Sequence, residues 1–400
     1  MGLCPRVLAG YLTLWFASGA LAEWDISGFV SAEGRFFTQS PRFSTQPETA
    51  TGSLSFKPEF YREWGDDLFQ SFLFVPFGRI DKDDAERTHF DIRELTWLLA
   101  ADAAELRLGF RKVFWGVAES NHLVDVINQT DLVENIDVED RLGQPMVNLA
   151  LISDFGTLDL FVLTGFRERT FPGREGRLQG PLRIDLGRAS FESAAGNKHV
   201  DYAARYSHFI GDFDIGLSHF WGTSREPRFL FQQLPSGERV LVPRYDLIHQ
   251  TSVDLQATKG DWLWKFEGLR REGQGDTYLA AVGGFEYTFV GAFDTAMDVG
   301  VLSEYHIDDR WRDALSPFNN DLFVGSRLAV NDAADTQFLG GLFSDLYGNG
   351  YFLNLEASRR FGDYWKLELE ARFFLDIKPA DPLAPIARDD YVLIELFRYF

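Results

Sequence analysis

The sequence is poor in cysteine and histidine, and after residue 22 it has no long apolar run. Cys4 is the only cysteine, so the chain beyond residue 22 has no disulfide and no thiolate metal site. None of the seven histidines falls in a zinc-binding His-Glu-x-x-His pattern. A membrane-spanning helix needs about 20 consecutive apolar residues, which the chain after residue 22 does not offer. These absences exclude disulfide-rich secreted domains, thiolate metalloproteins and helical membrane proteins.

Positive charge is also scarce. The chain has 39 Lys and Arg against 60 Asp and Glu, a net charge of −21, so no basic surface could neutralise phosphates and no nucleic-acid partner is expected. Much of the excess lies at residues 81–86, 134–140 and 308–313, which we expect to be solvated loops. Binding of divalent cations beside lipopolysaccharide is the alternative, although the spacing fits no calcium loop.

The first 22 residues read as a cleaved signal peptide. Arg6 is their only charge, Val7 to Phe16 form an apolar run, and Ala20-Leu21-Ala22 supplies the small residues before a cleavage site. The run is too short for a spanning helix. We therefore expect export, cleavage after Ala22, and one domain over residues 23–400.

Aromatic residues make up 15% of the chain, which fits a wall of alternating strands with aromatic girdles. The last segment, Asp390 to Phe400, alternates Val392, Ile394 and Leu396 with Glu395 and ends on phenylalanine. It resembles the assembly signal of Gram-negative outer-membrane barrels. Phe400 would then be the residue that the barrel assembly machinery recognises.

Eighteen segments of strand length follow residue 22, joined by connections that are short and long in turn. Short periplasmic turns and long external loops are typical of outer-membrane barrels. If Asp25 to Thr38 runs outward, the eighteenth strand brings Phe400 to the periplasmic side, where the N-terminus also lies. The expected fold is all-β, a transmembrane antiparallel barrel of about 18 strands with both termini periplasmic; 16 or 20 strands remain open.

Charged residues on these strands alternate with apolar ones, as between Tyr364 and Asp376. A charge facing lipid costs about 2–4 kcal/mol at mid-membrane, so we expect the charged series to face the lumen. The predicted pore-lining residues are Lys57, Glu59, Arg107, Arg111, Glu119, Lys265, Glu267, Glu286, Asp298, Arg327, Glu356, Arg360, Lys366, Glu368, Glu370, Arg372 and Glu395. They carry both signs, so they could form a transverse field that orients a solute or pair with one another across strands.

Residues 116–145 form the third long loop, which we expect to fold inward as a constriction. Leu123, Val126, Ile127, Leu132 and Val133 recur at near-helical spacing. The alternative is that they anchor a surface loop to the rim.

A family resemblance rests on this region. The run Leu108-Gly109-Phe110-Arg111-Lys112-Val113-Phe114-Trp115-Gly116-Val117-Ala118-Glu119-Ser120, with Asp125-Val126-Ile127-Asn128-Gln129-Thr130-Asp131 after it, resembles a motif of porin-like proteobacterial outer-membrane barrels, in the style of alginate-export barrels. Many members have proline where this chain has Gln129. The resemblance implies an outer-membrane channel or export partner and names no substrate.

The motif also has a direct physical interpretation. Trp115 would sit at the outer interface, and Gly116 would permit a sharp turn over the lumen. Glu119 would pair with Arg111 or Arg107. Asp125, Asn128 and Asp131 recur every three residues and could line a short helix at the constriction, binding a cation or a hydroxyl-rich solute. They could instead cap turns and form ion pairs.

Catalysis is not expected. Ser207-His208 and Ser218-His219 are neighbours on strands and point to opposite faces. His199 and Asp201 would share a face, but no second acidic pair can be placed opposite them. We therefore expect no enzyme, no catalytic residue, no cofactor and no metal.

The sequence thus predicts a porin-like channel for passage or export of small polar solutes. Its expected partners are outer-membrane lipid, lipopolysaccharide, the barrel assembly machinery and an unnamed solute. The alternative is a non-conducting barrel that acts as a surface receptor, an adhesin or the outer-membrane partner of a transport or secretion complex. Ion preference, monomer or homotrimer, and closure of the pore by residues 116–145 and 167–198 stay open.

Overall fold

A computed structural model describes residues 24–65 and 68–400. The predicted signal peptide, residues 1–22, lies outside the described residues.

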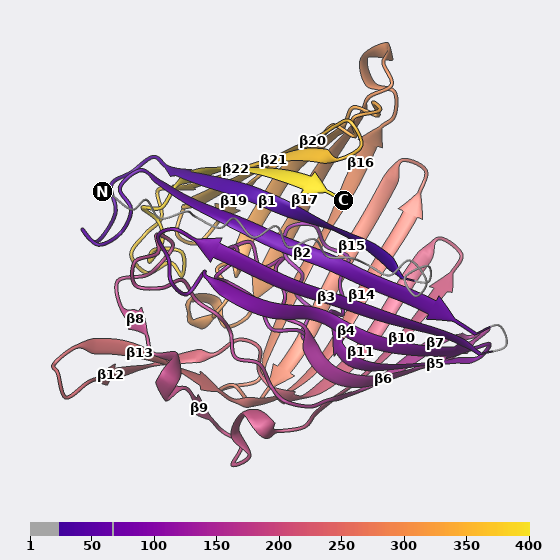
Figure 1. Cartoon of the computed structure of the whole chain (residues 1–400), viewed down its shortest axis with the longest axis horizontal. Coiled ribbons are helices and arrows are strands. Elements are labelled where there is room, and N and C mark those ends of the chain that lie inside the picture. The colour runs from indigo at the N-terminus through magenta and orange to yellow at the C-terminus, as the bar shows by residue number, and fades with distance from the viewer. Residues whose placement is uncertain (1–23, 66–67) are drawn as a thin grey trace, which may run out of the picture.

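Over these residues, eighteen strands form one antiparallel sheet, and the pairing of β1 with β22 closes it into a barrel. Figure 1 shows the indigo β1 beside the yellow β22. The first nine strands of the barrel are β1 (Asp25–Phe37), β2 (Ala50–Trp64), β3 (Phe69–Asp81), β4 (His89–Ala101), β5 (Ala104–Arg111), β6 (Gln144–Ser153), β7 (Gly156–Leu163), β10 (Asp201–Ile210) and β11 (Phe213–Thr223). The other nine are β14 (Leu247–Lys259), β15 (Trp262–Glu272), β16 (Tyr278–Phe289), β17 (Asp298–Asp308), β18 (Asn320–Ala329), β19 (Gln337–Asp345), β20 (Tyr351–Phe361), β21 (Trp365–Leu375) and β22 (Tyr391–Tyr399). The predicted all-β antiparallel barrel and its number of strands are confirmed.

Short and long connections alternate as expected from β1 to β15. Beyond β15 the alternation is weaker, because the connections 273–277 and 346–350 are shorter than the turns 290–297 and 330–336 at the other end. The turn from β4 to β5 consists of Asp102 and Ala103, whereas residues 112–143 join β5 to β6. Because successive strands are antiparallel, the short turns gather at one end of the barrel and the long loops at the other (Figure 1). No helix in the described ranges is both long and apolar enough to cross a membrane.

Each strand of the barrel has one face that points outward and one that points into the barrel. On β21, Leu369 is exposed on the outside, while Arg372 on the other face is 1% exposed. The same outward exposure holds for large apolar residues all round the barrel, among them Val30, Phe56, Leu217, Leu279, Val324, Ile394 and Leu396. The period-2 alternation therefore gives an apolar outer surface and a polar inner one.

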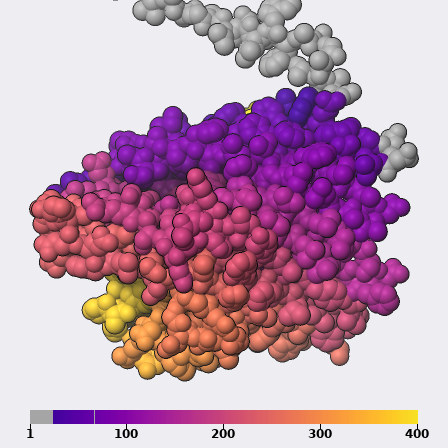
Figure 2. All heavy atoms as spheres, turned by 90° about the horizontal axis from the view of Figure 1, so that it is seen from below, coloured from indigo at the N-terminus to yellow at the C-terminus, as the bar shows by residue number. Residues whose placement is uncertain are grey.

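The long loops after β7 and β11 contain a second, small sheet that the sequence did not predict. In it, β13 (Arg239–Tyr245) pairs with β12 (Arg228–Gln233) antiparallel, and with β8 (Arg183–Ile184) and β9 (Ser190–Phe191) parallel. This sheet extends away from the barrel in Figure 1, and Figure 2 shows the salmon-coloured part of the chain standing out at one end. Four short 3-10 segments complete the described structure: η1 (Leu186–Arg188), η2 (Gly196–Lys198), η3 (Ala292–Asp294) and η4 (Trp311–Asp313).

Candidate functional site

The third loop, residues 112–143, folds into the barrel. Val124 and Ile127 are fully buried and join an apolar cluster with Phe161 of β7, Phe220 of β11 and Ile248 of β14. The apolar residues of the loop therefore anchor it against the inner wall. Between its two strands the loop has turns and single bridges but no helix, so the short helix suggested by its spacing does not form.

Gly116 begins the inward turn. Its φ of +127° is a conformation that residues with a side chain rarely adopt. A Cβ there would lie 2.7 Å from Oε1 of Glu267. Glycine thus allows both the turn and the close approach to β15. Trp115 does not sit at the outer interface as expected, because its ring is buried against Phe161, with centroids 5.8 Å apart.

Two wall carboxylates hold the first half of the loop, and we name this the first attachment. Glu267 of β15 accepts hydrogen bonds from the backbone N–H groups of Val117 at 2.6 Å, Ala118 at 2.8 Å and Val124 at 3.0 Å. Glu304 of β17 accepts from the N–H groups of Glu119 and Ser120, each at 2.8 Å. Both wall carboxylates are almost fully buried. Since the two carboxylates bind main-chain donors, these five hydrogen bonds do not depend on the side chains of the residues that donate them.

Glu119 pairs with residues far away in sequence. Its carboxylate lies 2.7 Å from Arg327 of β18 and 3.3 Å from Lys265 of β15. The expected pairing with Arg111 or Arg107 is therefore wrong. Arg111 instead donates to Asn148 at 2.6 Å, and Arg107 pairs with Glu105.

Asp125, Asn128 and Asp131, the polar residues that recur every three positions, hold the base of the loop together. Asn128 accepts from the N–H of Val113 at 2.8 Å and donates to the carbonyls of Arg111 and Leu142. Asp125 pairs with Arg141 at 3.1 Å, and burial raises the pKa of its carboxyl although Arg141 opposes the shift. Asp131 binds Arg93 and Thr170. All three side chains are buried, so their contacts are within the protein.

The tip of the loop reaches β21 and β22, and we name this the second attachment. Asn135 donates to Glu370 of β21 at 3.0 Å and accepts from the hydroxyl of Tyr391 at 3.1 Å. Asp137 lies 3.0 Å from Arg372. Burial raises the pKa of Asp137 to about 7, Glu370 adds to the shift, and Arg372 opposes it. The loop thus spans from β15, β17 and β18 to β21 and β22.

A cavity of about 220 Å³ lies between the tip of the loop and the wall formed by β1 to β4, β21 and β22. Its cationic lining comes mainly from β1 to β4 and the start of the loop: Arg35, Lys57, Arg79, Arg93 and Lys112, with Arg87. Its acidic lining comes mainly from the loop, β21 and β22: Glu134, Asp137, Asp140, Glu368, Glu370 and Glu395, with Glu33 of β1. The charges therefore largely separate by side.

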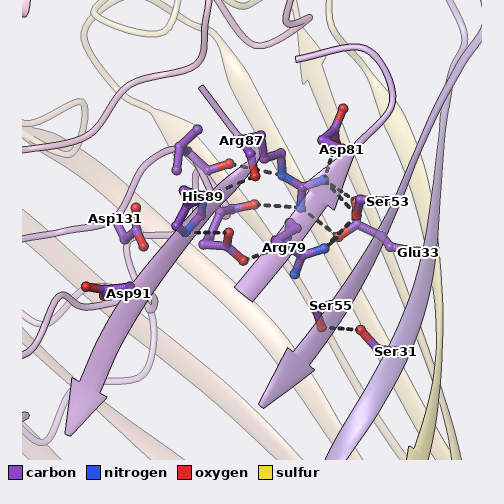
Figure 3. Close-up of polar contacts among 12 residues, drawn as sticks. Ser31, Glu33, Ser53, Ser55, Arg79, Asp81, Arg87, His89, Asp91 and Asp131 are labelled. Atoms are coloured by element: carbon purple, nitrogen blue, oxygen red, sulfur yellow. Dashed lines mark hydrogen bonds and ion pairs between the residues drawn. The ribbon is translucent and has the colours of Figure 1, made fainter. Parts of the chain in front are cut away.

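Two arginines that line this cavity, Arg79 and Arg87, belong to a buried network that the sequence did not single out. Arg87 and Arg79 converge on Glu33, at 2.7 Å and 3.0 Å (Figure 3). Arg79 also donates to Glu134 of the loop at 2.9 Å, and Arg87 to the carbonyl of Val133. The segments 81–86 and 134–140 are therefore only partly solvated, since Asp81, Asp84 and Glu134 are buried. The period-2 alternation of Glu33, Arg35, Arg79 and Asp81 with smaller or apolar residues was the available signal.

Some of the predicted pore-lining residues pair with one another, and others are free to contribute to a field across the lumen. Lys366 pairs with Glu368 at 2.7 Å, Glu356 with Arg372 at 3.5 Å, and Glu286 with Arg327 at 3.5 Å. Lys57 and Lys112 have no carboxylate within ion-pairing distance among the described residues, and Nζ of Lys57 lies over the ring of Phe29, 5.5 Å from its centroid. The remaining predicted pore-lining residues do not border the cavity of about 220 Å³. Glu59 is on β2, Arg360 lies over the ring of Tyr399, and Asp298 accepts hydrogen bonds from the N–H of Gly291 and from the side chain of Asn331.

A second cavity, of about 580 Å³, lies under the start of the third loop. Trp115, Gly116 and Val117 border it together with the β6–β7 turn and with Arg205 and Asp254, which pair with each other at 2.6 Å. Hollows therefore lie on both sides of the loop.

Phe400 lies where the barrel closes. Its N–H donates to the carbonyl of Gly28 at 3.1 Å, and its ring stacks on Phe56, with centroids 6.1 Å apart.

Comparison with solved structures shows the fold. OpdQ of Pseudomonas aeruginosa superposes with a TM-score of 0.53 at 12% identity, over 94% of this chain and 97% of that one. OccAB1 of Acinetobacter baumannii gives 0.52 at 9% identity, over 94% and 96%. OccK11 (OpdR) of P. aeruginosa gives 0.52 at 10% identity, over 94% and 95%. No protein-family model matches the sequence, and no curated protein matches it.

Proposed function

We propose that this barrel is an outer-membrane channel for passage or export of small polar solutes, with the third loop as its constriction. One observation carries the proposal: the third loop leaves β5, crosses the inside of an 18-strand barrel to β15 and β17, and is fixed again at its tip to β21. A barrel of 16 to 18 strands generally encloses an aqueous channel. A polypeptide tied across it narrows the channel without filling it, and the cavities beside the loop remain as the route.

The outer surface supports the membrane location. Large apolar side chains are exposed on strands all round the barrel, as Leu279 and Val324 are. A soluble monomer rarely exposes a contiguous apolar patch of more than a few hundred Å². Outer-membrane lipid and lipopolysaccharide are the partners that cover such a surface, after delivery by the barrel assembly machinery. Residues 1–22 are the export signal, and both termini are periplasmic.

Selectivity comes from the charged cavity. Cations on one wall and carboxylates on the loop and β21 to β22 create a field across the route. A polar solute with separated charge aligns with that field, whereas an apolar solute of equal size does not. No bond is made or broken in this process, so passage through the channel requires no catalytic residue and no cofactor. The motif of residues 108–131, similar to that of porin-like export barrels, agrees with this function.

A second function has a specific observation in its favour. Phe229, Leu230 and Phe231 of β12 are exposed in succession on the small outer sheet. An exposed apolar edge strand is suited to binding a protein partner. A barrel that works through this sheet is a surface receptor, an adhesin or the outer-membrane part of a transport or secretion complex.

The test is the conductance of the refolded chain in a planar bilayer. A variant lacking residues 119–141 should show larger steps, because the tie across the barrel is gone. A matched variant lacking residues 234–238, the turn of the β12–β13 hairpin, should conduct as the intact chain does. Absence of current from all three, with barrel folding confirmed by heat-modifiable migration, would reject the channel and favour the partner function.

A further inference from the structure

His89, the first residue of β4, has one ring nitrogen committed to the backbone. Its Nδ1 lies 3.1 Å from the carbonyl oxygen of Arg87. A carbonyl oxygen only accepts, so Nδ1 carries the hydrogen of this bond. In a neutral ring Nε2 then presents a lone pair. A ring nitrogen that donates to a backbone carbonyl is the usual arrangement of a histidine that binds a metal through its other nitrogen.

The lone pair of Nε2 faces an oxygen that is also an acceptor. Oε1 of Glu134 lies 3.4 Å away, and neither atom has a hydrogen-bond partner among the described residues. The Glu134 side chain is 4% exposed. Its other oxygen, Oε2, accepts from Arg79 at 2.9 Å, which aims Oε1 at the imidazole. Two acceptors at this distance repel each other unless a proton or a metal ion lies between them.

The spacing fits a metal ion. Two ligands on a tetrahedral zinc ion, at bond lengths of about 2.0–2.2 Å, lie roughly 3.3–3.5 Å apart. A third ligand stands close by, since His89, Glu134 and Asp131 each offer one ligand atom and these three atoms lie within 4.8 Å of one another. Arg93 and Thr170 hold this carboxylate at 2.5 Å each. Figure 3 shows His89 and Asp131 beside the arginine network.

We propose that His89 and Glu134, with Asp131 as third ligand, bind a divalent transition-metal ion of the zinc class between β4 and the third loop. The imidazole ligand disfavours calcium and magnesium, which prefer oxygen. Arg79 and Arg93 offset part of the negative charge of Glu134 and Asp131. Asp140 adds a further carboxylate, which interacts electrostatically with both of these acids. This site departs from the expectation that the protein binds no metal. It does not depend on the channel function.

Such an ion would cross-link the loop to the wall. Glu134 and Asp131 belong to the third loop, whereas His89 belongs to the barrel, so one ion would join the two. Metal binding would therefore hold the tip of the loop in place. Without the ion, the tip would still be held by the second attachment and by hydrogen bonds that include those from Arg79, Arg87, Arg93 and Thr170.

The test is a calorimetric titration of the refolded chain in detergent micelles with Zn²⁺ at pH 7.5. We expect one ion per chain, and at least tenfold weaker binding in His89→Gln and in Glu134→Gln. His249→Gln and Glu139→Gln are the controls and should bind as the intact chain does. No stoichiometric binding, or equal binding by His89→Gln, would overturn the proposal and leave a proton between the two groups.

A second measurement needs no variant. Zn²⁺ should protect His89 from acylation by diethyl pyrocarbonate, measured by mass spectrometry of the peptides, and should leave His249, exposed on β14, as reactive as before. Equal acylation of His89 with and without Zn²⁺ would contradict the site even if the variants fail to fold.

Discussion

The two attachments of the third loop are built differently. At the first, Glu267 and Glu304 bind backbone N–H groups that any residue except proline supplies. At the second, Asn135 and Asp137 bind Glu370, Arg372 and Tyr391 through side chains. The first attachment fixes the course of the chain, while the second places charges at the cavity. The position of the loop therefore depends on the first attachment, and the selectivity of the proposed channel depends on the second.

The largest effect should follow from breaking the first attachment. Glu267→Ala leaves three buried N–H donors without an acceptor, at about 1–3 kcal/mol each. We expect a loss of about 3 kcal/mol or more in the stability of the loop, and fast hydrogen exchange at residues 117–124. Glu272→Ala, on the same strand but outside the attachment, is the control. Slow exchange in the Glu267 variant would mean that the apolar cluster and Glu304 hold the loop without Glu267.

Breaking the second attachment should cost less. Asn135→Ala removes the hydrogen bonds to Glu370 and Tyr391, a loss of about 1–2 kcal/mol. Exchange should rise at residues 131–140 and stay slow at 117–124. If both segments loosen together, the loop is one cooperative unit and the distinction between the attachments fails.

Charge changes at the cavity should alter selectivity without moving the loop. Lys57 and Lys112 have no ion-pair partner among the described residues, so Lys57→Glu with Lys112→Glu breaks no bridge. In a salt gradient the reversal potential should shift toward cations, on the order of a fewfold in permeability ratio. Arg359→Glu, near the short-turn end, should shift it less. An equal shift in both variants would remove the lysines from the route.

Arg107 and Arg111 allow a related test. Reversal of both to glutamate should also shift the potential toward cations, by less than the lysine pair, because each arginine already has a polar partner. No shift would show that the two arginines lie away from the ion path.

The smallest expected effect is a dependence on pH at the second attachment. The pKa of Asp137 is raised to about 7 in the folded loop, against about 4 in the unfolded chain. Its contribution to stability is therefore full below pH 4 and is lost as pH rises through 7. Exchange at residues 131–140 should be faster at pH 8.5 than at pH 5.5, after correction for intrinsic rates. Asp137→Asn should remove the difference; its persistence there would assign it to another group.

The sequence predicts the barrel well because its signals are local. Period-2 alternation and turn residues define each strand, and eighteen strands follow without knowledge of their partners. The inward third loop was also predicted, from its place and composition. The contacts of the loop were not predicted. Glu267 binds Val117, which lies 150 positions away in the chain, and Glu119 pairs with Arg327 and not with Arg107 or Arg111, which are nearer in sequence. The small sheet escaped prediction because β8 and β9 have two residues each.

The backbone character of the first attachment has a consequence for how this protein can change. The backbone hydrogen bonds of residues 117–120 and 124 survive any substitution except proline, since every other residue supplies the N–H donor. Their side chains are constrained only by their other contacts, such as the place of Val124 in the apolar cluster and the pairing of Glu119 with Arg327. Glu267, Glu304 and Gly116 cannot vary in this way. A lineage could therefore alter the charges facing the solute one substitution at a time while every intermediate keeps its loop in place.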